Sequence, residues 1–201
     1  MIDTNIISSD DRIINIKAHD QLLKSEILNL NLPARLDDNL QFTYDILIAY
    51  DTYMQKKAAL VHRRVNFYKQ ISYTFLDNDG RFYSYINLHV GNVVQIKEES
   101  GISFAIIKAL FTHKYNDGST YAFVWINWLR ESLTIDPILQ CPVYEVQKAE
   151  NVRWHRVYPI ALIIGIPKVH FVHRCGSACT STSHDLSNNQ YFRNDFYYTA
   201  I

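Results

Sequence analysis

The stretch from Gly91 to Ser132 constrains the fold most strongly, because it contains three strand-like runs separated by two turns. Residues 93–97 alternate apolar and polar side chains, residues 104–111 are almost all apolar, and residues 120–128 are rich in aromatic and β-branched side chains. These compositions suit the pleated, half-buried surface of a sheet. Asn116-Asp117-Gly118, between the last two runs, favours a hairpin turn. The stretch therefore predicts a twisted antiparallel sheet.

Two helices are expected before residue 80 and short strands after it. Apolar residues recur near a 3.6-residue period over about residues 43–64 with no Gly or Pro inside, and a shorter run with this spacing covers residues 20–30. Further strands are expected at residues 65–75, 81–88, 143–146, 157–164, 169–173 and 195–201. We expect a mainly β protein, in which residues 81–201 form a distorted barrel of short antiparallel strands and residues 1–80 form a partly helical N-terminal extension.

Charge and cysteine content narrow the class of protein. The 201 residues include 20 basic and 20 acidic side chains, so the net charge of zero predicts no overall attraction to nucleic acid or to a membrane surface. The three cysteines are an odd number, and no basic-then-apolar leader begins the sequence, which favours an intracellular protein. No apolar run approaches the roughly 20 residues of a membrane-spanning helix, so no membrane partner is expected.

Basic side chains are concentrated near the end of the longer predicted helix. Residues 52–76 contain no acid, and the basic residues among them are Lys56, Lys57, Arg63, Arg64 and Lys69. Such a group can contact nucleic-acid phosphates, which predicts salt-sensitive binding to DNA. A solvated helix surface is the alternative, because basic runs of this size are common on ordinary surfaces.

Motifs for catalysis are missing from the sequence. The six glycines never form the closely spaced set of a phosphate-binding loop, and no Gly-x-Ser-x-Gly elbow is present. The turn Asp77-Asn78-Asp79-Gly80 resembles part of a calcium loop, but Phe75 and Ile86 then occupy positions that require carboxylates. We therefore expect a protein without enzymatic activity.

One group of side chains has the chemistry of a metal site. His173, Cys175, Cys179 and His184 place two imidazoles and two thiols within twelve positions, which matches the ligand preference of zinc. The spacing is not that of a standard zinc finger. A loop without metal and a Cys175–Cys179 disulfide remain open as alternatives, and His170 is a possible replacement for His173.

Six short segments follow one another in the second half of the chain: 90–96 (VGNVVQI), 103–111 (SFAIIKALF), 124–130 (VWINWLR), 157–165 (VYPIALIIG), 169–172 (VHFV) and 196–198 (FYY). In this order they resemble the segments of a bromo-adjacent homology (BAH) domain, and the resemblance covers about residues 83–201. Two features depart from the family pattern: Glu131 and Ser132 replace the proline after the Trp-x-x-Arg motif, and the closing strand lacks its Cys-Arg pair.

The resemblance implies a non-catalytic, nuclear chromatin module that engages nucleosomes, histone tails or another chromatin protein. Some BAH domains hold a methylated lysine in an aromatic cage, through the attraction of a cation to ring faces. By position, the resemblance implies Phe104, Trp128, Tyr144 and Trp154 as candidate cage residues. Packing of these rings in the core is the alternative. Two other functions stay open: a nucleic-acid-binding module, and a protein-assembly subunit whose aromatic face meets a partner.

Overall fold

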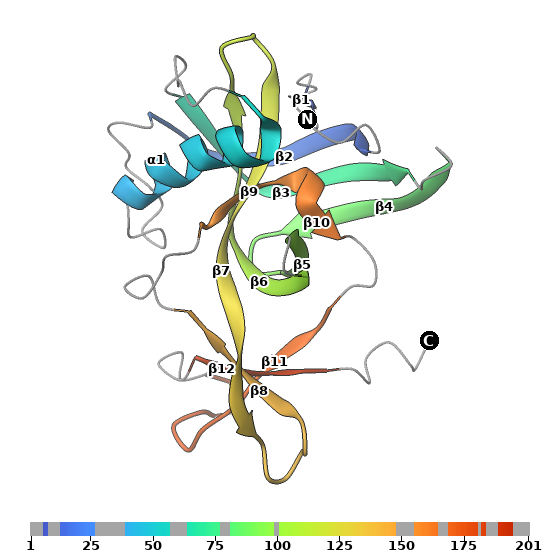
Figure 1. The fold of residues 1–201 in the computed structure, drawn as a ribbon. Coiled ribbons are helices and arrows are strands. Elements are labelled where there is room, and N and C mark those ends of the chain that lie inside the picture. The colour runs from blue at the N-terminus through green and yellow to red at the C-terminus, as the bar shows by residue number, and fades with distance from the viewer. Residues whose placement is uncertain are drawn as a thin grey trace.

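The mainly β class is confirmed by a computed structural model: among the residues that it describes, one sheet dominates and one α-helix lies against it (Figure 1). The structure describes residues 6–7, 13–26, 39–56, 64–76, 81–98, 101–147, 155–164, 169–180, 182–183 and 189–194. None of the helices among these residues has the length and apolar character needed to cross a membrane.

Twelve strands, one α-helix and two shorter helical segments follow one another along the described chain. They are β1 (Ile6–Ile7), β2 (Ile13–Glu26), α1 (Asn39–Ile48), the π-helical segment η1 (Ala49–Tyr53), β3 (Arg64–Leu76), β4 (Phe82–His89), β5 (Val93–Glu98), β6 (Gly101–Lys114), β7 (Thr120–Ile135), β8 (Pro142–Val146), β9 (Val157–Pro159), the 3-10 turn η3 (Ile160–Leu162), β10 (Ile163–Ile164), β11 (Phe171–His173) and β12 (Gln190–Arg193). The three runs expected between Gly91 and Ser132 are β5, β6 and β7, so this part of the prediction is confirmed.

The sheet is branched and open. Its main path runs β10-β5-β6-β7-β8-β12-β11, while β3 pairs with β2, β4 and β6 to form a branch. No pairing joins β10 to β11 among the described strands, so the sheet is not closed into the expected barrel. Residues on both sides of the boundary expected at residue 80 contribute to this sheet, because β3 pairs with both β4 and β6.

A β-bulge in β6 allows its central part to be buried on both faces. Ile107 pairs with Ile126 and Ala109 pairs with Trp125, so Lys108 is the extra residue on β6. A bulge of this kind reverses which alternate side chains point to a given face. As a result, Ile107 belongs to one hydrophobic cluster of the sheet and Ala109 to the other. Burial on both faces explains why residues 104–111 read as a nearly continuous apolar run.

Helix α1 covers one face of this central sheet. Phe42 and Ile46 of α1 share one buried hydrophobic cluster with Phe111 and Trp125, and the Phe42 and Trp125 rings are stacked at 4.5 Å. Tyr50 of η1 belongs to the same cluster and packs edge-on against Phe123 at 5.2 Å. The expected helix at about residues 43–64 is thus real but differs in extent: it begins at Asn39, continues through the π-helical segment to Tyr53, and β3 already begins at Arg64.

The short helix expected at residues 20–30 is wrong where the structure describes it, because the chain up to Glu26 belongs to β2. Strand β2 pairs with β3 along its length and buries Ile16 and Ala18, two residues apart as on one face of a strand. Two register shifts interrupt this pairing, and they hide the alternation that marks a strand in sequence. The closing strand expected at residues 195–201 lies outside the described residues, and β12 ends at Arg193.

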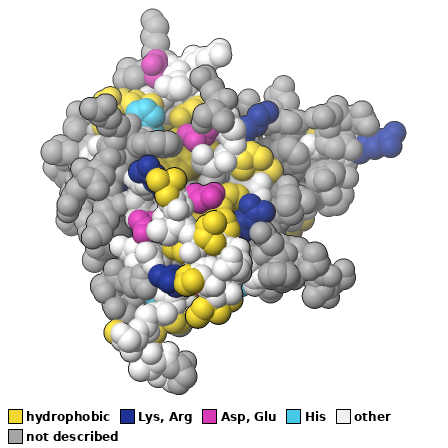
Figure 2. Space-filling model, turned by 60° about the horizontal axis from the view of Figure 1, so that its bottom comes forward, with side chains coloured by type: hydrophobic (Ala, Val, Ile, Leu, Met, Phe, Trp, Pro, Cys, Tyr) yellow, Lys and Arg dark blue, Asp and Glu magenta, His cyan; other side chains and the backbone are white. Residues whose placement is uncertain are grey.

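The lower part of the sheet projects from this core. We call it the extension: the start of β6 (residues 101–104), which pairs with β7 at Leu129, the C-terminal half of β7 (residues 129–135), β8, β11, β12 and the loop at residues 174–180. The other described residues form the body (Figure 1). At its tip, Leu133 near the end of β7 and Ile138 in the β7–β8 turn are almost fully exposed. Hydrophobic side chains lie among acidic and basic ones when the lower end is turned toward the viewer (Figure 2).

Candidate functional site

Three rings from strands that are not neighbours meet in the extension, and we call them the aromatic cluster: Phe104 on β6, Tyr144 on β8 and Phe171 on β11. Ring centroids lie 6.0 Å apart for Phe104 and Tyr144, 5.4 Å for Phe104 and Phe171, and 5.0 Å for Tyr144 and Phe171. The contacts are tilted or edge-to-face, the arrangements that aromatic pairs prefer. The sheet must therefore curl strongly to bring β11 back to β6.

Opposite charges lie at the border of the aromatic cluster. The guanidinium carbon of Arg193 lies 5.5 Å from the centroid of the Phe104 ring, within the range of a cation–π contact. The Tyr144 hydroxyl donates a hydrogen bond to Oε2 of Glu131 at 3.2 Å. Phe104 and Phe171 are half-buried, whereas Arg193 and Glu131 are exposed. The cluster thus offers water-accessible aromatic surface with a carboxylate close by.

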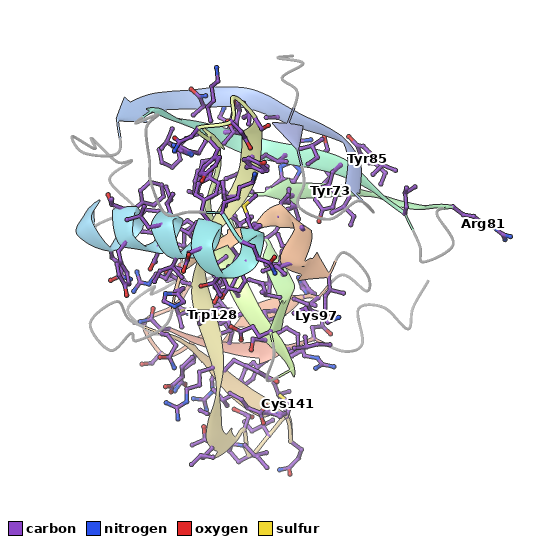
Figure 3. The ribbon with its side chains drawn as sticks, turned by 45° about the horizontal axis from the view of Figure 1, so that its top comes forward. Tyr73, Arg81, Tyr85, Lys97, Trp128 and Cys141 are labelled. Carbon is purple, nitrogen blue, oxygen red and sulfur yellow. The ribbon has the colours of Figure 1, made fainter. Side chains whose placement is uncertain are left out.

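Trp128 does not belong to this cluster. It pairs with Ala105, whereas Phe104 pairs with Leu129, so the alternation of strand side chains puts Trp128 on the opposite face of the sheet. Figure 3 labels Trp128, which lies on β7. Only 4% of Trp128 is exposed, its Nε1 donates to the backbone carbonyl of His155 at 3.0 Å, and its ring packs edge-on against Tyr158. Trp128, which the resemblance implied as a cage residue, is therefore a core residue.

The four-residue cage implied by the resemblance is therefore not assembled. Phe104 and Tyr144 are brought together, while Trp154 lies outside the described residues. Phe171, which the sequence reasoning did not select, completes the cluster, and no local signal points to it because it lies 67 positions after Phe104. Because the three rings contact one another, they do not surround an open cage, and the cation contact of the cluster is that of Arg193 with the Phe104 ring.

Three of the four predicted metal ligands converge at the end of β11. The ligand atoms of His173, Cys175 and Cys179 all lie within 4.8 Å of one another. The two cysteines are not joined by a disulfide. Partial desolvation, followed by the adjacent Cys179 thiol, holds the pKa of the Cys175 thiol above its ordinary value. His184 lies outside the described residues.

His170, the alternative ligand, is placed differently. It is not among the three residues whose ligand atoms converge, and its Nδ1 lies 3.3 Å from Nδ2 of Asn194, which donates to it. The histidine of this group among the described residues is therefore His173, as the sequence pattern first indicated.

The basic group near η1 is only partly described. Lys56 forms an ion pair with Asp117 at 2.9 Å, and its ammonium lies 5.1 Å from the Tyr115 ring and 5.2 Å from the Tyr121 ring. Hydrogen bonds to Tyr121 and Asp117 raise the pKa of Lys56. Lys69 is exposed on β3, and Arg64 begins that strand. Lys57 and Arg63 lie outside the described residues. DNA binding by this group stays a prediction.

A buried carboxylate that the sequence reasoning missed joins α1 to the segment before β9. Asp45 is fully buried, and its carboxylate accepts hydrogen bonds from the Gln41 side chain at 2.6 Å and from the Arg156 backbone N–H at 3.0 Å. Nδ1 of His155 lies 3.8 Å from the same carboxylate. Burial raises the pKa of Asp45 despite these partners. Its sequence signal is an acid placed between Phe42 and Ile46 on the apolar side of the helix.

The sequence matches no family model and no curated protein. The BAH resemblance therefore stays a prediction, and the aromatic cluster and the His-Cys-Cys group are candidate sites on the strength of their own geometry.

Proposed function

We propose that this chain is a non-catalytic interaction module that binds a cationic side chain, such as a methylated lysine of a histone tail, on the aromatic cluster of the extension. The observation that carries the proposal is the position of Arg193, whose guanidinium is held over the half-buried Phe104 ring. A surface that holds one cation through its ring face has the electrostatic character needed to hold another.

Exchange of the internal cation for an external one is physically reasonable. Arg193 is exposed, so displacing its guanidinium from the Phe104 ring does not uncover a buried charge. Glu131 is also exposed and lies one hydrogen bond from Tyr144, where it can attract a positively charged peptide. The incoming cation then occupies the outer face of Phe104, and flanking peptide residues contact the extension.

The BAH resemblance supports the same class of partner. It implies a nuclear protein that engages histone tails, nucleosomes or another chromatin protein, and the proposed ligand is one that this class of partner presents. A protein partner other than a histone remains within the proposal if it presents a lysine or arginine side chain to the cluster.

Calorimetric titration with histone-tail peptides tests the proposal. The peptides carry lysine, trimethyllysine or a neutral carbon isostere of trimethyllysine at the same position. If the ring face recognises charge, the isostere should bind about 5- to 30-fold more weakly than trimethyllysine, corresponding to about 1–2 kcal/mol of cation–π attraction. Equal affinity for the two peptides, or binding to neither peptides nor nucleosomes, contradicts the proposal.

Matched variants locate the binding surface. Phe104→Leu removes the aromatic face while keeping an apolar side chain, and it should abolish the preference for trimethyllysine over the isostere. Val172→Ala is the control, because Val172 lies next to Phe171 on β11 but points to the other face of the strand and is 43% exposed.

Arg193→Gln removes the competing cation and should raise affinity for the trimethyllysine peptide.

A further inference from the structure

The His173, Cys175 and Cys179 side chains are close to the geometry of a tetrahedral metal site. Around zinc, a thiolate sulfur and an imidazole nitrogen lie roughly 3.5 Å apart and two sulfurs roughly 3.8 Å apart, since Zn–S is about 2.3 Å and Zn–N about 2.0–2.1 Å. The Sγ of Cys175 lies 3.9 Å from Nδ1 of His173, and no pair among the three ligand atoms exceeds 4.8 Å. Side-chain shifts of about 1 Å or less therefore bring all three to coordination distance.

Hydrogen bonds at Arg174 and Cys179 bring the three ligands near one another before any ion binds. Arg174, between His173 and Cys175, donates its backbone N–H to the Gln190 carbonyl at 2.8 Å. Its guanidinium binds the Asp136 carboxylate at 3.0 Å and 3.2 Å and the Gln190 side chain at 2.7 Å. The Cys179 N–H then donates to the Gly176 carbonyl at 3.1 Å, closing the turn that returns the second thiol.

The loop that carries the two cysteines has little apolar material to fix it. Residues 175–178 are exposed, and none of the residues 174–180 belongs to the buried core. A loop without buried apolar side chains gains its order from hydrogen bonds alone unless a cross-link or metal is added. A bound ion would supply the missing constraint.

We propose that His173, Cys175 and Cys179 bind a zinc ion that fixes the loop following β11. Two thiolates and an imidazole are the soft and borderline ligands that zinc prefers, and the group contains no carboxylate that would favour calcium or magnesium. Binding displaces one proton from each thiol, and the neutral imidazole coordinates through a ring nitrogen.

The proposed zinc site is linked to the aromatic cluster through β11 and β12. Phe171 and His173 lie on the same face of β11, because they are two residues apart. His173 pairs with Tyr191, their rings meet edge-on at 5.4 Å, and Tyr191 in turn pairs with Tyr144. Zinc at the end of β11 would therefore hold in place the strand that supplies one ring of the cluster.

Metal content of the purified, reduced chain tests the proposal directly. We expect about one equivalent of zinc by mass spectrometry after gel filtration, and replacement by cobalt should give thiolate-to-cobalt charge-transfer bands and the intense visible bands of a tetrahedral site. Less than about half an equivalent of zinc after loading with excess zinc, or a cobalt spectrum without thiolate bands, overturns the proposal.

The third cysteine provides a matched control. Cys175→Ser and Cys179→Ser should each lower zinc affinity by about tenfold or more. Loss of a residue that only hydrogen-bonds a metal ligand already causes a decrease of about this size, so loss of a direct ligand should cause at least as much. Cys141→Ser should leave affinity unchanged, because Cys141 is not part of the converging group. His170→Gln should also leave it unchanged. An equal loss in Cys141→Ser and Cys175→Ser overturns the assignment.

Thiol protection in the unaltered chain keeps the test independent of variant folding. Zinc should slow alkylation of Cys175 and Cys179, as read residue by residue by mass spectrometry, while Cys141 reacts at the same rate with and without zinc. A Cys175–Cys179 disulfide that persists under reducing conditions, or alkylation that zinc does not change, rules out the proposed site.

Discussion

The body and the extension share β7 but are stabilised in different ways. In the body, α1 and both faces of the central sheet enclose large side chains, with Tyr50, Phe111 and Trp125 almost fully buried. The extension buries Val143 and Tyr144 but leaves Phe104 and Phe171 half-exposed. The body is thus ordered by hydrophobic burial, whereas the extension depends on a few ring contacts, the Arg174 hydrogen bonds and, as proposed, a metal. The proposed binding surface therefore lies where the burial of aromatic side chains is incomplete.

The largest effect should come from emptying the body's core. Trp125→Ala removes a ring that stacks on Phe42, and we expect the free energy of unfolding to fall by about 3–5 kcal/mol. Chemical denaturation monitored by circular dichroism measures this loss. Phe171→Ala in the extension is the comparison and should cost clearly less, because the ring is half-exposed. Similar losses in the two variants would show that the regions are not stabilised differently.

Zinc removal should affect the extension more than the body. At a free zinc concentration a hundredfold above the dissociation constant, bound metal contributes about 2.7 kcal/mol to the free energy of unfolding. Hydrogen exchange after chelation should become faster at the amides of residues 171–180 and stay unchanged at residues 109–111. Equal acceleration in both segments would indicate that body and extension open together.

Asp45 tests a polar contact inside the body. Asp45→Asn keeps one acceptor oxygen for the two donors, so the lost hydrogen bond should cost about 1 kcal/mol. Burial raises the pKa of Asp45, so the folded chain binds a proton on this carboxyl more tightly than the unfolded chain does. Protonation of Asp45 therefore stabilises the fold at low pH, and this contribution is lost as the pH rises from 3.8, the ordinary value, through the raised pKa. As the pH rises through this range, the free energy of unfolding of the unaltered chain should therefore fall relative to that of Asp45→Asn, which does not titrate. A constant difference, measured by thermal unfolding at several pH values, would contradict this.

The smallest effect should come from the ion pair between Lys56 and Asp117. Both groups are partly exposed, so Asp117→Asn should cost less than about 1 kcal/mol, and added salt should reduce the difference. The Lys56 hydrogen bond lowers the pKa of Asp117 to about 2, so its contribution is present above 3.8 and is lost as pH falls toward about 2. Thermal unfolding of both proteins across this range measures it. Ser177→Ala, in the exposed loop of the extension, is a neutral control.

Local patterns in the sequence predicted the hairpins of the body well. The run from Val93 to Trp128 combines β-forming side chains with a turn at Asn116–Gly118, so neighbouring residues are enough to specify its strands. Strand β2 could not be predicted in this way. Leu22, Leu23 and Glu26 have the spacing of one helix face, and two register shifts interrupt the alternation that would indicate a strand. Long-range pairing with β3 decided its conformation.

The two candidate sites also differ in whether neighbouring residues in the sequence are enough to predict them. Three metal ligands lie within seven positions, so the sequence itself revealed their proximity. The aromatic cluster depends on the curl of the sheet, which joins Phe104 to Phe171 and is not encoded near either residue. Trp128 was placed incorrectly because the face it occupies follows from strand register rather than from residue type.

The bulge at Lys108 also has a consequence for insertions and deletions. Ala109 and Phe111 face α1 only because one extra residue precedes them on β6, so loss of a single residue at this point would turn them, together with Leu110, to the wrong sides of the sheet. A change in chain length at Lys108 should therefore be rejected, because it would reverse the two faces of β6 that the two hydrophobic clusters require.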